Sequence, residues 1–287
     1  MAVAATGFFD GVHLGHRAVI DTLLSSSRSR GEESVVVTFW PHPRIVFQNG
    51  ARDLKLLQTL DNKVSTLQAL GVDKVEVVPF EHGFASLTAR EYLEMLRERF
   101  EVDSVVLGHD NRFGSDGLST SQIAELAATM DMGIEIVPPF IHEGAAISST
   151  RIRKALEIGD VEGAAVMLGH PYEISGVVVP GKQMGRTIAF PTANMSLREP
   201  LKCIPGPAAY LSEVMVDGEK FTGMTNVDRS FKVETNIFEF SRDIYGHDIT
   251  VRFLRRLRGE IRFNSFEELR AQLLKDREHA IELSHIK

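Results

Sequence analysis

The stretch from residue 7 to residue 16 combines two histidines with three glycines, in the order Gly-Phe-Phe-Asp-Gly-Val-His-Leu-Gly-His. His13 and His16 are three positions apart across Gly15, so both imidazoles can face one phosphate while the glycine lets the backbone approach it closely. If the two histidines are considered without their surroundings, the alternative interpretation is that they form a solvated helix cap. Zinc is a poorer alternative, because no third ligand lies nearby at a metal-like spacing.

The segments on either side place this stretch on a turn between a strand and a helix. Residues 2–6 are small and apolar, which indicates a buried strand, and apolar residues recur at helical spacing after residue 18. In open α/β sheets ligands bind at such turns, where a helix N-terminus attracts phosphate. The residues that we expect to bind phosphate here are Gly7, Phe8, Asp10, His13, Gly15 and His16.

Strand-like and helix-like segments alternate through the first half of the chain. Predicted strands at 34–39, 75–78, 104–107 and 134–137 are interleaved with predicted helices at 61–70, after the capping box that starts at Thr88, and at 121–130. Short apolar strands in this order are typical of a doubly wound parallel sheet.

A polar loop follows three of these strands. The loops cover residues 38–43, 108–114 and 147–153. Each alone fits a turn or a helix cap, but four polar loops at the carboxyl ends of one sheet, counting residues 7–16, indicate a single site. The candidate ligand-binding residues in them are His42, Asp110, Asn111, Arg112, Ser148, Ser149, Thr150 and Arg153.

These residue types suit nucleotidyl transfer. Hydroxyls and free backbone N–H groups at a helix start, with Arg153 one turn on, can surround a triphosphate together with the histidines and stabilise departing pyrophosphate. A phosphate-oxygen nucleophile is already ionised and needs no general base, so alignment and charge neutralisation are enough. We recognise no activated serine or cysteine nucleophile, which fits direct in-line attack.

Length and composition favour an ordinary two-domain protein. The chain has 287 residues, of which 43% are hydrophobic and 25% are charged. A helical pattern ends at Gly169-His170-Pro171, so we expect domains at 1–170 and 171–287. A net charge of −7 argues against a general nucleic-acid or membrane binder. One cysteine, no recognisable signal peptide and no apolar run near about 18 residues predict a cytoplasmic protein.

The second half has the texture of a small antiparallel β-barrel. Predicted strands at 174–179, 210–216 and 249–253 are separated by turn residues. A final helix is predicted after Ser265, with Glu268 at the box position.

Two features of this half could carry chemistry. The glycines at 181 and 185, with Arg186, suit a loop over phosphate, and Thr192 and Asn194 offer hard oxygen ligands for Mg²⁺. Glu234 could take a proton from a hydroxyl substrate. The ordinary alternatives are a turn for Pro-Thr-Ala-Asn and a solvated surface glutamate. The phosphate-binding candidates are Gly181, Gly185 and Arg186.

The motifs together resemble the bacterial bifunctional riboflavin kinase/FMN adenylyltransferase (FAD synthetase) family. They are Gly-x-Phe-Asp-Gly-Val-His-x-Gly-His, Thr-Phe-x-Pro-His-Pro, Gly-x-Asp-x-Arg-Phe-Gly and Ser-Ser-Thr-x-Ile-Arg, then Phe-Pro-Thr-Ala-Asn and Glu-x-Asn. The resemblance implies that ATP and FMN give FAD and pyrophosphate, with His13 and His16 on the ATP phosphates. It also implies that riboflavin is phosphorylated, with Thr192 and Asn194 on Mg²⁺–ATP and Glu234 activating the ribityl 5′-hydroxyl.

The sequence departs from the family pattern at a few positions. Asn111 stands where an aromatic residue is usual, Ala189 replaces a glycine, and residues 207–210 and 225–231 differ in segments that we expect to be loops over flavin or nucleotide. A monofunctional FMN adenylyltransferase with a degenerate kinase domain is therefore the main alternative. A non-catalytic flavin-binding regulator, or a nucleotidyltransferase for phosphorylated pantetheine or a nicotinamide nucleotide, is favoured less. The sequence predicts no oligomeric state.

Overall fold

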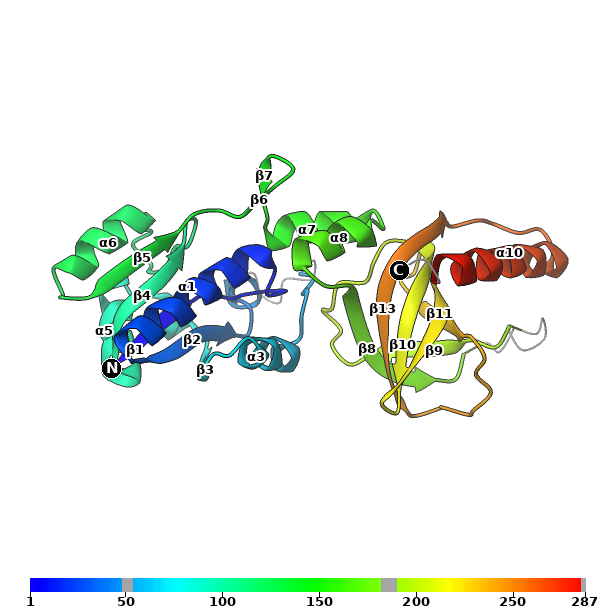
Figure 1. Ribbon diagram of the computed structural model, residues 1–287, viewed down its shortest axis with the longest axis horizontal. Coiled ribbons are helices and arrows are strands. Elements are labelled where there is room, and N and C mark those ends of the chain that lie inside the picture. The colour runs from blue at the N-terminus through cyan, green and yellow to red at the C-terminus, as the bar shows by residue number, and fades with distance from the viewer. Residues whose placement is uncertain (48–53, 182–189, 285–287) are drawn as a thin grey trace. The chain divides into compact units, whose positions relative to one another are not determined.

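The computed structural model describes residues 1–47, 54–181 and 190–284 (Figure 1). The chain divides into two compact units, Met1–Ser149 and Thr150–Lys287. Helices α7 (Ser149–Glu157) and α8 (Val161–Leu168) thus belong almost entirely to the second unit, where α8 packs against strands β8 and β13. The predicted domain boundary near residue 170, which follows the change in sequence texture, remains a prediction.

The described strands of the first unit form a five-stranded sheet in the order β3-β2-β1-β4-β5, and every neighbouring pair is parallel. This confirms the predicted sheet, with β1 at its centre. The strands are β1 (Ala2–Thr6), β2 (Glu33–Trp40), β3 (Lys74–Pro79), β4 (Val102–Gly108) and β5 (Gly133–Val137). Strand β2 continues to Trp40, so the loop after it is shorter than predicted.

Helices cover both faces of this sheet. Successive residues of β1 alternate between two cores: Ala2 and Ala4 pack with helices α5 and α6, whereas Val3 and Ala5 pack with α1 and α3. The predicted capping box at Thr88 is present and starts α5. The helices are α1 (Leu14–Arg30), α2 (Pro43–Phe47), α3 (Leu60–Ala69), α4 (His82–Ala85), α5 (Ala89–Phe100) and α6 (Thr120–Ala128). A two-stranded hairpin follows, made of β6 (Ile141–His142) and β7 (Ala145–Ala146).

The described strands of the second unit close into an antiparallel barrel, in the order β10-β11-β12-β9-β8-β13. The predicted barrel is therefore confirmed. The strands are β8 (Tyr172–Val179), β9 (Ala193–Leu197), β10 (Ala208–Val216), β11 (Glu219–Val227), β12 (Val233–Ile237) and β13 (Asp248–Gly259).

Parts of the two segments that we expected to be loops are strand residues. Ala208–Tyr210 pairs with Thr225–Val227 in the β10–β11 ladder, and only the turn at 228–232 remains outside it. The expectation was wrong because these segments contain small and polar residues and so lack the alternation of apolar and polar residues that marks a strand. They are strands because they pair with each other in the β10–β11 ladder.

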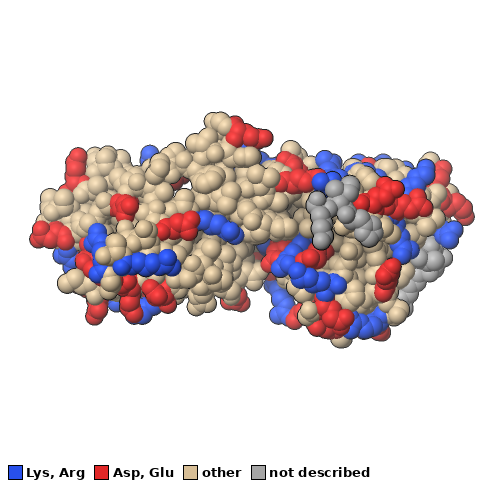
Figure 2. All heavy atoms as spheres, in the orientation of Figure 1, with Lys and Arg blue, Asp and Glu red and all other residues tan. Residues whose placement is uncertain are grey.

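Helix α10 (Phe266–Ser284) closes the described chain against the outside of the barrel. Its Ala280 packs in one apolar cluster with Leu211, Met224 and Phe238. Ser265 accepts the predicted capping hydrogen bond from the Glu268 N–H at 3.1 Å. No helix among the described residues has the length and apolarity to cross a membrane. On the face seen in Figure 2, acidic and basic side chains are interspersed.

Candidate functional site

His13 lies just beyond the carboxyl end of β1 and caps helix α1. Its Nδ1 accepts a hydrogen bond from the His16 N–H at 3.2 Å, and the two rings stack with centroids 3.6 Å apart and planes 15° apart. Because Nδ1 is an acceptor, the neutral ring carries its proton on Nε2, which makes Nε2 a donor. A Cβ on Gly15 would lie 3.2 Å from the His13 ring, so glycine leaves the room that this stack needs. The cap and the phosphate site predicted for these histidines are thus compatible.

His16 is held in an environment that disfavours a positive charge. Its pKa is well below the ordinary value, first because of burial and then because of the nearby His13 and Lys63. Its Nδ1 is buried and has no hydrogen-bond partner among the described residues, and the edge-on Phe9 ring lies 5.3 Å away, centroid to centroid. The imidazole is therefore neutral before a ligand binds, and an incoming anion would raise its pKa.

The loop between β1 and α1 has an unusual backbone. Phe9, Gly11 and Val12 all have positive φ, at 53°, 85° and 37°. Such conformations are strained for residues with a side chain and persist only where surrounding groups hold them.

Asp10 is one of the groups that hold this loop. Its carboxylate accepts hydrogen bonds from the Leu57 and Gln58 N–H groups, at 2.9 and 3.1 Å, and the Ser149 hydroxyl donates to its backbone oxygen at 2.9 Å. Asp10 is 4% exposed. A carboxylate only accepts hydrogen bonds and carries the same charge as phosphate, so what Asp10 does in this structure is hold the loop backbone.

Lys63 is a second such group, and its role was not predicted. Its Nζ donates to the Phe8 carbonyl and to the Thr38 hydroxyl, both at 2.9 Å, and lies 4.0 Å from the centroid of the Phe8 ring. The side chain is 2% exposed, and burial lowers its pKa to about 8, which the Asp10 carboxylate partly opposes. A lysine within a polar stretch of helix gives no sequence signal for such burial.

His42 of the Pro-His-Pro loop lies beside this cluster. Its ring meets the Phe8 ring edge-on, with centroids 4.2 Å apart, and its Nδ1 accepts from the Arg44 N–H at 3.1 Å. The loops after β1 and β2 are therefore in contact, as expected for strand ends at one edge of a sheet.

The loop after β4 closes the same edge. The Asn111 side chain donates to the Thr6 carbonyl at 2.6 Å, which joins this loop to the end of β1. Asp110 is exposed and pairs with His109, with Oδ1 and Nδ1 3.7 Å apart, and Arg112 is exposed as well.

The predicted serine-rich stretch spans the division between the two units. Ser148 and Ser149 belong to the first unit, and Ser149 is joined to Asp10 as described. Thr150 and Arg153 belong to the second unit and lie on the first two turns of α7.

In the second unit, adjacent strands bring the predicted kinase residues onto one face. Glu234 of β12 pairs with Asn194 of β9 on one side and with Asn226 of β11 on the other. Side chains directly opposite one another in antiparallel strands point to the same face, so these three groups share it. Asn226 was not predicted as a site residue.

The start of β9 is tightly supported. The Asn236 side chain donates to the Pro191 carbonyl at 2.7 Å, and a Cβ on Gly181 would lie 2.2 Å from the Asn194 amide nitrogen. Gly181 therefore allows the backbone to lie directly against Asn194. Gly185 and Arg186 lie outside the described residues.

A cavity of about 250 Å³ lies beside Thr192. One wall comes from the barrel, and the other is the loop at 240–245, which was not predicted to contribute. The lining residues are Val178, Pro191, Thr192, Ala193, Thr235, Ile237, Phe240, Ser241, Arg242, Asp243, Ile244 and Tyr245.

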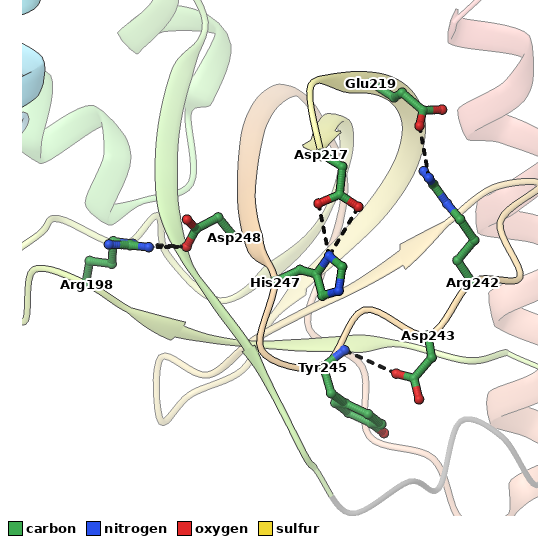
Figure 3. Close-up of polar contacts among 8 residues, drawn as sticks. All are labelled: Arg198, Asp217, Glu219, Arg242, Asp243, Tyr245, His247 and Asp248. Atoms are coloured by element: carbon green, nitrogen blue, oxygen red, sulfur yellow. Dashed lines mark hydrogen bonds and ion pairs between the residues drawn. The ribbon is translucent and has the colours of Figure 1, made fainter.

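Polar contacts tie this loop, and His247 just after it, to the β10–β11 turn (Figure 3). Arg242 donates to Glu219 at 2.9 Å, and His247 Nδ1 lies 3.0 Å from Asp217. Within the loop, the Tyr245 N–H donates to Asp243 at 3.2 Å. The outer wall of the cavity is thus anchored on both sides of residues 243–245.

Comparison with known proteins identifies both halves of the chain. Residues 1–151 match the family model of FAD synthetase, and residues 168–284 match that of riboflavin kinase. These matches support the resemblance predicted from the motifs.

Relatives that match this chain over nearly their whole length carry both activities in their names. The chain is 34% identical to the bifunctional riboflavin kinase/FMN adenylyltransferase of Bacillus subtilis, over 98% of this chain and 92% of the relative. It is 36% identical to the proteins of the same name from Listeria monocytogenes and Escherichia coli K12, over 96% of this chain and 90% of each relative. A crystal structure titled as a macrolide-efflux protein from Streptococcus pneumoniae is also similar, with TM-score 0.89 and 33% identity over 96% of this chain and 92% of that one.

Proposed function

The chain belongs to the family of bifunctional riboflavin kinase/FMN adenylyltransferases, and we propose that it uses ATP twice, to phosphorylate riboflavin and to adenylylate FMN. The observation that carries the second activity is the stacked His13–His16 pair at the N-terminus of α1. The family supplies the reactions, and the geometry of the described residues supplies the roles proposed for them.

In adenylylation, an oxygen of the FMN phosphate attacks the α-phosphorus of ATP. A new P–O bond forms, the bond from the α-phosphorus to the bridging oxygen breaks, and pyrophosphate leaves with that electron pair. The nucleophile is already ionised, so no side chain has to remove a proton. The site has to align two anions and stabilise the charge on the leaving group.

We assign that stabilisation to the α1 N-terminus and the histidines. His13 presents Nε2 as a donor, and the positive end of the α1 dipole faces the same region. Proposed partners of the triphosphate are Gly7, Phe8, Gly15, Ser148, Ser149, Thr150 and Arg153, with Asp10 holding the loop. For the FMN side we propose His42, Asp110, Asn111 and Arg112.

In riboflavin phosphorylation, the ribityl 5′-hydroxyl attacks the γ-phosphorus of ATP, and ADP leaves. The hydroxyl proton must go to a base, and Glu234 is a carboxylate that shares a face with Asn194, one of the predicted metal ligands. The row formed by Asn194, Glu234 and Asn226 supports placing this chemistry on the face of the barrel wall that these three side chains share.

We propose that Mg²⁺ binds with ATP at Thr192 and Asn194. Hydroxyl and amide oxygens suit this hard cation. Because Gly181 has no Cβ, nothing at that position collides with the Asn194 amide. No cluster of three or more His, Cys, Asp or Glu that could hold a metal occurs among the described residues, so the nucleotide phosphates would supply further oxygens. Bound Mg²⁺ would neutralise charge on those phosphates. The cavity beside Thr192 is our proposed nucleotide pocket. The use of ATP, together with a buried Cys203 that forms no disulfide, fits the cytoplasm.

The direct test is product analysis by chromatography. One tube holds riboflavin, ATP and Mg²⁺, and the other holds FMN, ATP and Mg²⁺. The proposal predicts FMN and FAD from the first tube and FAD from the second. FAD from FMN alone would establish the monofunctional alternative, and no flavin product in either tube would overturn the proposal.

A further inference from the structure

We propose that Lys63 is a positioning residue for adenylyl transfer, which holds the loop between β1 and α1 in its working shape. The inference rests on the adenylylation proposed above. Lys63 lies on α3 and outside the motifs quoted above, so its role is argued from its contacts.

The contacts of Lys63 join three segments at the carboxyl edge of the sheet. From α3, the ammonium group reaches the Phe8 carbonyl just beyond β1 and the Thr38 hydroxyl near the end of β2. The Thr38 hydroxyl also lies 3.2 Å from the Phe8 carbonyl. The three groups therefore form one compact, buried polar cluster.

This arrangement is a poor device for stability alone. The lysine is 2% exposed, and its direct polar partners are neutral oxygens, whereas an apolar side chain of similar length would avoid the desolvation of an ammonium group. The Phe8 ring, 4.0 Å from Nζ, offsets part of that cost. A group retained at a cost to stability is expected where it serves a site.

The segment that Lys63 holds leads directly to the histidines. Phe8 contacts the His42 ring, and the next residue, Phe9, contacts His16 while adopting positive φ. A shift of the Phe8 carbonyl would therefore move both aromatic rings and, with them, two imidazoles of the site. Asp10 anchors the same loop through the N–H groups at 57 and 58, just ahead of α3.

Replacing Lys63 with methionine tests the inference, because Lys63→Met keeps the length and removes the ammonium group. We expect kcat for FAD formation from FMN to fall about 30-fold or more, as misplacement of catalytic groups does. The KM values for ATP and FMN should change less than about threefold, because the binding groups remain. The ¹⁵N resonances of the labelled His16 ring should move in the variant.

The chain offers a matched control in Lys202. It is also buried, 4% exposed, with Nζ 4.5 Å from the Tyr172 ring centroid, but it belongs to the second unit. Lys202→Met should leave FAD formation from FMN and the His16 resonances unchanged. The inference is wrong if Lys63→Met keeps the wild-type kcat, or if Lys202→Met loses it equally.

A second variant covers the case in which Lys63→Met does not fold. Thr38→Val removes the hydroxyl partner at nearly constant volume and should lower kcat several-fold in the same direction; an unchanged kcat would overturn the inference. Wild-type protein that makes no FAD from FMN would instead overturn the proposed function, so the two failures are distinguishable.

Discussion

The His13 ring lies flat against the His16 ring and accepts the His16 backbone N–H, so one side chain both caps α1 and orders its neighbour. A helix cap and a phosphate site would ordinarily compete for the same imidazole. Here the cap uses Nδ1 as an acceptor, so in the neutral ring the proton is on Nε2 and that nitrogen is a donor. The stack thus explains why the two histidines need the spacing that the sequence gives them.

Gly15→Ala should impair adenylylation without unfolding the protein. The new methyl group would press on the His13 ring, from which the Cβ position is 3.2 Å away, although alanine favours a helix by up to about 1 kcal/mol. We expect kcat/KM for FAD formation to fall by about 10-fold or more. Gly83→Ala is the control, because a Cβ there meets nothing within 4 Å. Equal activity of the two variants would contradict the account.

The buried Lys63 should leave a signature in the pH dependence of stability. The pKa of Lys63 is about 8 in the folded protein, against an ordinary value of 10.5. Below about pH 8 the folded protein therefore buries a charged ammonium group. Between the two pKa values the unfolded chain binds more protons than the folded protein. The free energy of unfolding of the wild type should therefore rise with pH between these two values. Lys63→Met lacks the titrating group and should lack this contribution.

Urea unfolding followed by the fluorescence of Trp40, on β2 of the first unit, measures this difference. From about pH 7.5 to about pH 9.5, the free energy of unfolding of wild type should gain about 2 kcal/mol relative to Lys63→Met. Parallel pH profiles for the two proteins would show that Lys63 titrates normally.

Filling the cavity beside Thr192 should weaken ATP binding in the kinase reaction. Ile244 lines that cavity, and Ile244→Trp would occupy much of it. We expect KM for ATP in riboflavin phosphorylation to rise about 10-fold or more, while FAD formation from FMN is unaffected. The exposed Ile261→Trp is the control. An unchanged KM for ATP would remove the cavity from the nucleotide site.

Local patterns predicted the parts of the fold that local forces determine. The apolar residues of β1 and the capping box at Thr88 follow from periodicity and hydrogen-bonding rules, and both are in place. The histidine pair could be predicted because two residues three positions apart at the start of a helix lie on the same side of it, and this is visible in the sequence alone.

The missed residues depend on contacts between distant segments. Lys63 looks like a solvated lysine in its helix, and only the approach of Phe8 and Thr38 buries it. The loop at 240–245 has no motif of its own, and it lines the cavity only because it lies against the barrel. Asn226 became visible only through strand register.

The central claim is that two separate sites carry two reactions, and one paired measurement tests it most directly. His16→Ala and Glu234→Gln are each assayed for FAD formation from FMN and for FMN formation from riboflavin. We predict that His16→Ala loses FAD formation by about 100-fold or more and keeps riboflavin phosphorylation, and that Glu234→Gln does the reverse. Parallel loss of both activities in either folded variant would contradict the two-site account.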